Sequence, residues 1–172
     1  LVIWTASDNS GNTSTCSFNV LVEDQQSPIF TSCGVTTDTS VIVEAGLCTY
    51  TQRDNSWNAA AVDLCTNTTL SYALSGATSG TGTTLNGVSF NLGNTLVVWT
   101  ASDQDGNTST CSFNVIVTDT QDPIINCVLN QTVNVDAGQC NYTKTGTAWN
   151  AIANDNCTVS TVLATLSGAT TA

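Results

Sequence analysis

The chain has 172 residues, of which two are Lys or Arg, thirteen are Asp or Glu and none is His, so its formal net charge is −11 at pH 7. This balance excludes nucleic acid as an expected partner, because phosphate binding needs Lys and Arg side chains to displace counterions, and no apolar run approaches the roughly 20 residues of a membrane span. The absence of histidine removes the commonest general base and metal ligand, so we expect no catalytic residues and no enzyme.

The predicted elements, taken from the N-terminus, are short strands separated by turns. Pro28 suits a linker or an edge strand. Residues 40–43 and 71–74 are short apolar segments that indicate strands. Between them, residues 58–62 form the only stretch that suits a helical turn. Asn86 and Gly87 then mark a tight turn.

The strongest local signal is a β-hairpin after that turn. Residues 96–101 form a strongly apolar strand, and residues 103–107 have the composition of a turn. The segment 110–117 alternates in polarity, which places four side chains on one face: Cys111, Phe113, Val115 and Val117.

An internal repeat organises these elements. Residues 1–30 recur as residues 96–125, 95 positions later, with most positions identical. Cysteines 33, 48 and 65 recur as cysteines 127, 140 and 157, at offsets of 94 and then 92. We therefore expect the C-terminal strands of one repeat in residues 1–23, a complete repeat in 24–118 and the N-terminal half of another in 119–172.

Half of a domain cannot bury a core. The repeat pattern thus predicts that the chain is a section of a longer array, or that neighbouring copies complete each other's half domains by strand addition. About seven short strands in each repeat of some 95 residues indicate an all-β fold of tandem immunoglobulin-like sandwiches. Eight cysteines in so short a chain indicate an oxidising compartment, so we expect an exported, extracellular or cell-surface protein.

Several motifs occur in a fixed order along the repeat. Residues 122–127 read DPIINC, residues 138–140 read GQC and residues 155–157 read DNC. Residues 90–93 read FNLG, and residues 100–115 read TASDQDGNTSTCSFNV, a segment that recurs with small changes at 5–20.

This order resembles the hyalin-repeat (HYR) domain over essentially the whole chain. The departures are small: Ser27 stands where the family has Asp, and Leu64 where it has Asn. The resemblance implies an immunoglobulin-like fold and a role in adhesion. With four cysteines per repeat, the chain looks like the members found in long bacterial surface adhesins, notably those of gliding Bacteroidota.

Four cysteines per repeat allow three pairings. The first strand of a sandwich lies beside the last, which favours Cys33–Cys111, and the resemblance implies the same bond. That leaves Cys48–Cys65 and, by repetition, Cys140–Cys157, while Cys16 and Cys127 are expected to pair with cysteines beyond these 172 residues. A zinc site is the rival interpretation, but the chain has neither histidine nor a closely spaced cysteine pair.

Acidic residues are expected to gather where one repeat meets the next, and oxygen clusters without nearby cations suit Ca²⁺. The cluster expected at the start of the middle repeat consists of Asp24, Asp54, Asp63, Asp103 and Asp105. The cluster expected at its end consists of Glu44, Asp119, Asp122 and Asp155. The alternative is that these are ordinary acidic loops, with residues 103–107 a turn whose side chains cap the backbone.

The leading functional hypothesis is a non-catalytic repeat of a long secreted or surface-attached bacterial adhesin, which acts as a rigid spacer or stalk. Its expected partners are neighbouring repeats of the same chain. One alternative is a subunit of an extracellular filament whose partners are other copies. A second is a carbohydrate-binding module that stacks surface glycans on its aromatic residues, although core packing is the expected role of Trp99.

Overall fold

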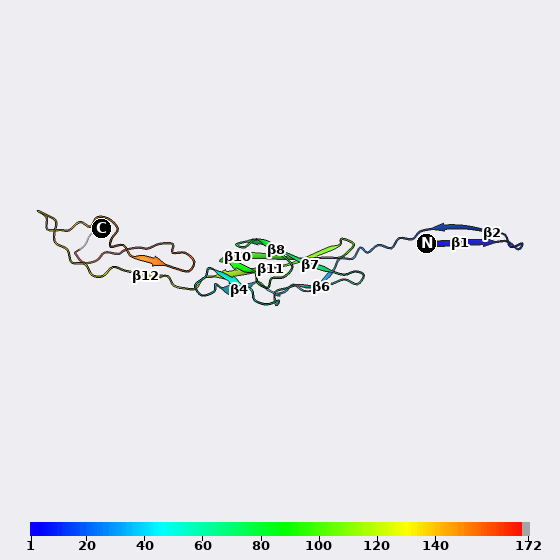
Figure 1. Cartoon of the computed structure of the whole chain (residues 1–172), viewed down its shortest axis with the longest axis horizontal. Coiled ribbons are helices and arrows are strands. Elements are labelled where there is room, and N and C mark those ends of the chain that lie inside the picture. Colours follow the sequence, from blue (N-terminus) through cyan, green and yellow to red (C-terminus); the bar gives the residue numbers. More distant parts are fainter. Residues whose placement is uncertain (170–172) are drawn as a thin grey trace.

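The computed structural model describes residues 1–169, and its central part is a β-sandwich (Figure 1). One layer is a five-stranded sheet in the order β4 (Thr39–Ile42), β11 (Thr108–Thr118), β10 (Gly93–Ser102), β7 (Thr69–Gly76) and β8 (Gly80–Gly82). Strand β4 runs parallel to β11, and the other neighbours are antiparallel. Two strand pairs pack against this sheet: β3 (Ile29–Ser32) with β6 (Ala60–Val62), and β5 (Thr49–Thr51) with β9 (Ser89–Asn91).

Alternation along the two longest strands fixes which side chains enter the core. In β11, Phe113, Val115 and Val117 are buried while their neighbours are not, because successive residues of a strand point to opposite faces. In β10, Val97 and Trp99 are fully buried on the same face. The predicted hairpin and its inward face are confirmed.

Aromatic rings fill the space between the layers. The Trp57 ring lies 5.7 Å from that of Phe90 and 6.4 Å from that of Phe113, both edge to face, and it stacks on Tyr50 at 5.7 Å. Gly34 allows this packing, because a Cβ there would lie 2.2 Å from the Trp57 carbonyl oxygen. Trp57 therefore belongs to the core.

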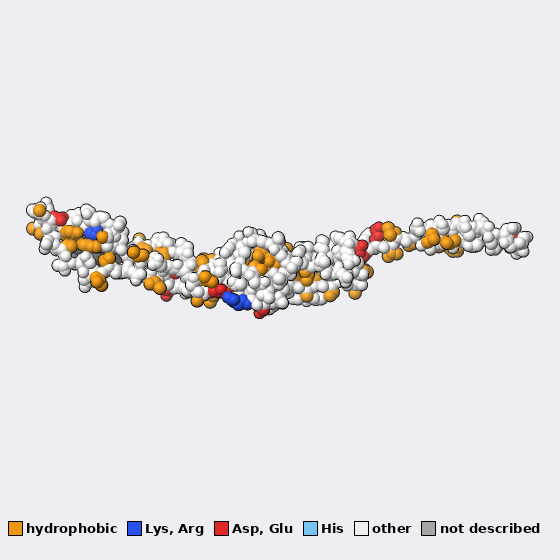
Figure 2. Space-filling model, in the orientation of Figure 1, with side chains coloured by type: hydrophobic (Ala, Val, Ile, Leu, Met, Phe, Trp, Pro, Cys, Tyr) orange, Lys and Arg blue, Asp and Glu red, His pale blue; other side chains and the backbone are white. Residues whose placement is uncertain are grey.

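A separate hairpin precedes the sandwich. Strands β1 (Val2–Ser7) and β2 (Thr13–Phe18) pair with the register of β10 and β11, so that Trp4 lies opposite Cys16 as Trp99 lies opposite Cys111. The burial differs sharply: Trp4 is 66% exposed and Trp99 is 0% exposed. Figure 2 shows apolar side chains on the surface of this hairpin.

The last part of the chain follows the sandwich at its other end, and the three parts form an elongated molecule (Figure 1). Its strands are β12 (Ile124–Asn126) and β13 (Ile152–Asn154), which pair antiparallel. Residues 170–172, the last of the predicted half repeat, lie outside the described residues.

The all-β, immunoglobulin-like fold predicted from the sequence is confirmed, with no helix in residues 1–169. Residues 58–62, the only stretch that suits a helical turn, do not form one, because residues 60–62 form β6 and pair with β3. Residues 1–169 hold no helix with the length and apolar character needed to cross a bilayer.

Candidate functional site

The first disulfide closes the sandwich. Cys33, just after β3, is bonded to Cys111 in β11, with the two Cα atoms 5.9 Å apart. This is the pair that the sequence favours, and it ties the start of the repeat to its last strand across 78 residues. By loop-closure entropy it stabilises the folded state by about 4 kcal/mol.

The second disulfide joins the sandwich to the segment that follows it. Cys48 is bonded to Cys157, 109 residues further along, with the Cα atoms 4.8 Å apart. The predicted bonds Cys48–Cys65 and Cys140–Cys157 are therefore wrong, and Cys65 and Cys140 are free thiols in the structure. The bond joins the middle repeat to the segment that the sequence assigns to the next one.

Strand direction explains this correction. Strand β4 runs parallel to β11, so the loop that carries Cys48 emerges at the end of the sandwich from which the chain leaves. Strand β6 runs antiparallel to β3, so Cys65 emerges at the opposite end, beside Asp24. A disulfide needs Cα atoms within about 7 Å, and these two loops lie at opposite ends of the domain.

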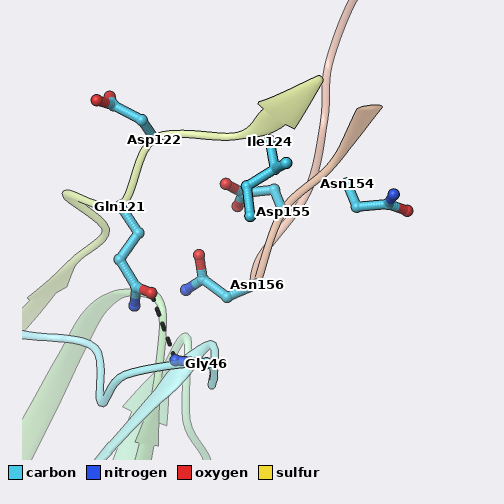
Figure 3. A pocket seen from close by; sticks show the side chains of 7 residues that line it. All are labelled: Gly46, Gln121, Asp122, Ile124, Asn154, Asp155 and Asn156. Carbon is cyan, nitrogen blue, oxygen red and sulfur yellow. Dashed lines mark hydrogen bonds between the residues drawn. The ribbon is translucent and has the colours of Figure 1, made fainter. Parts of the chain in front are cut away.

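Hydrogen bonds join the loop before Cys48 to the residues around Cys157, and Figure 3 shows the one between Gly46 and Gln121. The Asn156 side chain donates to the carbonyl oxygen of Leu47 at 2.8 Å. The Gln121 side chain accepts from the Gly46 amide and donates to the Glu44 carbonyl, both at 3.4 Å. The loop before Cys48 is thus held between the linker and the segment after β13, and the three form one junction.

The acidic residues expected at the end of the middle repeat come together only in part. Carboxylate oxygens of Asp119 and Asp155 lie within 4.8 Å of each other and of the Cys157 sulfur, which is held in the disulfide, so only the two carboxylates could bind a metal ion. Asp122 lines the same shallow hollow as Asp155 but points away from it (Figure 3). Glu44 instead forms an ion pair with Arg53, with an N–O distance of 2.6 Å.

The cluster expected at the start of the repeat shows the same partial assembly. Asp24 and Asp63 lie with Cys65 in an equivalent group within 4.8 Å, and Asp105 lines the adjoining hollow. One carboxylate oxygen of Asp24 is buried without a hydrogen-bond partner among the described residues. Two carboxylates supply only part of the six to eight oxygens that Ca²⁺ takes, so carbonyl groups and water would have to supply the rest.

The two other acidic residues predicted for this cluster hold turns. Asp54 accepts hydrogen bonds from the Gln52 side chain and from the backbone amide of Ser56. Hydrogen bonds from the side chain and backbone of Ser56 lower the pKa of the Asp54 carboxyl group. Burial raises the pKa of Asp103, but hydrogen bonds, chiefly from Asn107, outweigh it and hold the pKa below its usual value. Asp8 and Asn12 repeat this arrangement in the first hairpin.

The aromatic residues considered for sugar stacking divide between core and surface. Trp99 and Trp57 are buried, so their faces are not available to a glycan. Trp149 is half-buried, stands 5.6 Å from Tyr142 and has the Lys144 ammonium group over its ring at 5.2 Å.

The Cys48–Cys157 bond is the feature of the candidate site that sequence reasoning missed. Cysteine spacing alone carries no sign of it. A sequence signal that could have pointed to this bond is a recurring pair of motifs, Asp-x-Gln and Asp-x-Cys. The pair occurs at residues 24–26 with 63–65 and again at 119–121 with 155–157.

An all-β sandwich closed by a disulfide from its first strand to its last defines an immunoglobulin-like domain suited to an oxidising, extracellular environment. The model of the HYR domain matches residues 65–117, so this part of the chain is similar to the HYR domain, as the order of motifs implies. HYR domains are extracellular-type, non-catalytic repeats, which suggests an adhesion-type repeat here. No curated protein matches the chain.

Proposed function

We propose that this chain is a structural and adhesive repeat of a long secreted or surface-attached bacterial protein, in which each HYR domain is a rigid spacer. The observation that carries the proposal is the Cys48–Cys157 bond with the hydrogen bonds around it. A covalent bond beside the linker removes most of the freedom to bend that a single-chain linker leaves. A stalk made of such junctions projects a binding tip without collapsing, as attachment or gliding on a surface requires.

The test is the flexibility of the junction. Replacing Cys48 with serine should increase bending between the sandwich and residues 119–169, because only the linker and weak hydrogen bonds then join them. Small-angle X-ray scattering of the whole chain should show a broader distribution of interatomic distances and a shorter maximum dimension.

Cys16→Ser is the matched control, because Cys16 is an exposed free thiol in the first hairpin, away from this junction. It should leave the distance distribution unchanged. The spacer proposal fails if Cys48→Ser scatters like the unmodified chain.

Calcium is a second contribution to rigidity that we propose. The supporting observation is that Asp24 with Asp63, and Asp119 with Asp155, form equivalent carboxylate pairs at the two ends of the domain. Calorimetry should show a higher melting temperature in millimolar CaCl₂ than in chelator, and Asp24→Asn combined with Asp119→Asn should remove the difference. An identical melting temperature in both buffers would leave these carboxylates as acidic loops.

Association into a filament is the second candidate function. It is favoured by the exposed apolar side chains of the first hairpin, including Trp4 and Phe18, whose counterparts Trp99 and Phe113 are buried. Sedimentation of the chain over a range of concentrations distinguishes the two functions, because a filament subunit associates as its concentration rises and a spacer does not.

A further inference from the structure

Two free cysteines occupy positions that match the two halves of the inter-repeat disulfide. Cys65 corresponds to Cys157 and Cys140 corresponds to Cys48, each 92 residues apart. All four lie among the described residues, and only Cys48 and Cys157 are bonded to each other.

The surroundings of Cys65 reproduce those of Cys157. The Cys65 amide donates to Asp63 at 2.8 Å, as the Cys157 amide donates to Asp155 at 2.9 Å. In the neighbouring linkers, the Gln26 amide donates to Asp24 at 2.9 Å and the Gln121 amide to Asp119 at 3.0 Å. Both cysteines therefore stand in the same acidic turn, next to the same linker motif.

The loop around Cys140 likewise reproduces the loop around Cys48. The Glu44 amide donates to Thr49 at 2.8 Å and the Leu47 amide to Glu44 at 2.9 Å. The equivalent bonds run from Asp136 to Asn141 at 2.8 Å and from Gln139 to Asp136 at 3.0 Å. The glycine of each turn, Gly46 or Gly138, has a positive φ, of 74° or 77°. Cys140 is thus presented on the same turn as the bonded Cys48.

We propose that Cys65 and Cys140 are the two halves of a further disulfide between repeats. In it, Cys140 of one copy of this sequence bonds to Cys65 of the next copy. The partner is a second copy of this repeat. The bond would be equivalent to Cys48–Cys157, so that successive repeats are linked by one disulfide at each junction. This inference rests on the spacer function proposed above, which it deepens by naming the partner of each end.

One contact distinguishes the proposed junction from the observed one. Asn156 donates to the loop before Cys48, whereas the equivalent Leu64 has no side-chain donor. Gln26 keeps the amide that Gln121 uses on the same loop. The proposed junction therefore retains the sulfur bond and the glutamine contact and lacks one hydrogen bond.

The bond forms by thiol–disulfide exchange with a small disulfide such as oxidised glutathione. The Cys140 thiolate attacks one glutathione sulfur and releases a glutathione thiolate. The Cys65 thiolate then attacks the Cys140 sulfur of the mixed disulfide and releases the second. Two protein thiols and one glutathione disulfide thus become one protein disulfide and two glutathione thiols, which take up the two protons.

The Cys65 thiol stands beside carboxylates. The negative charge of Asp24 raises the pKa of the Cys65 thiol, and burial and Asp63 raise it further.

The experiment uses the 172-residue chain with Cys16 and Cys127 replaced by serine, which leaves Cys65 and Cys140 as its free thiols. Equal amounts of ¹⁵N-labelled and unlabelled chain are oxidised together with glutathione disulfide. The products are cleaved before aspartate, which places Cys65 in residues 63–102 and Cys140 in residues 136–154. The expected product is a Cys65–Cys140 peptide pair with half of the pairs of mixed isotope, which shows that the bond joins two copies.

Cys65→Ser in the same background is the control, and it should abolish the covalent oligomer while Cys48–Cys157 still forms. Recovery of both thiols unbonded, or a bond from Cys65 to Cys48, overturns the inference. If Cys48–Cys157 forms while Cys65 stays free, the proposed Cys65–Cys140 disulfide is contradicted and the spacer proposal is unaffected. If Cys48–Cys157 itself does not form, both fail.

Discussion

Replacing Trp99 with alanine is expected to lower the free energy of unfolding by about 3–5 kcal/mol, the range for a buried tryptophan. Trp99 is 0% exposed, and its ring lies 5.3 Å from that of Tyr72, edge to face at 72°. The substitution removes this contact and leaves a cavity between rigid strands. Urea denaturation followed by circular dichroism measures the loss.

Trp4→Ala is the matched control, because Trp4 holds the same position in the repeat and the same register with its hairpin partner. Its side chain is 66% exposed, so its removal should change the stability of the sandwich by less than about 0.5 kcal/mol. A similar loss for both variants would show that Trp99 does not hold the core of the sandwich.

The second large effect concerns force. Pulling the chain by its ends is expected to release no long segment from the sandwich while its disulfides are intact, because Cys33–Cys111 and Cys48–Cys157 together carry the tension past the residues that they enclose. Reductant opens both bonds and should add an unfolding step of about 260 Å for the segment that Cys33–Cys111 encloses, from roughly 3.4 Å for each residue released. Single-molecule force spectroscopy with and without reductant measures this step.

The variant Cys33→Ser, Cys111→Ser and Cys48→Ser should show the same step without reductant, because an intact Cys48–Cys157 bond would itself shield the residues that it encloses. Cys16→Ser should behave like the unmodified chain, because Cys16 is not in the tension path of the sandwich. A step of this length in the oxidised chain would mean that the bond does not shield the domain.

Sequence predicts the sandwich well where side-chain alternation decides it. The pattern of Phe113, Val115 and Val117 fixes both the strand and its inward face, since only one face of a strand can enter a core. Side-chain pattern does not predict the structure of residues 58–62. Their alanine-rich sequence suits a helical turn locally, but residues 60–62 form a strand because they pair with β3.

The candidate site could be predicted only in part. Cys33–Cys111 follows from the neighbourhood of the first and last strands. The prediction of Cys48–Cys65 is wrong because it comes from elimination, which assumes that every disulfide closes within one repeat. The direction of β4 sends Cys48 toward the next repeat, and that direction is a property of the sheet topology that cysteine spacing does not contain.

The acidic residues show the same division. The sequence brings Asp24 and Asp63 to one end of the domain and Asp119 and Asp155 to the other, as expected from the repeat. The capping turn that the sequence offers as the alternative at residues 103–107 is confirmed, because Asn107 donates to the Asp103 carboxylate. The sequence does not reveal that Asp54 also holds its own turn, because that hydrogen bond depends on local backbone geometry.

One sulfur bond closes the sandwich, and a second joins it to the segment that follows the linker. Disulfide mapping of the oxidised, unreduced chain tests this pairing most directly, since cleavage before aspartate places each of the eight cysteines in a different peptide. We expect residues 24–37 to be linked to 105–118, and residues 38–53 to 155–172. A link between residues 38–53 and 63–102 would contradict this pairing, because Cys48 would then close within its own repeat.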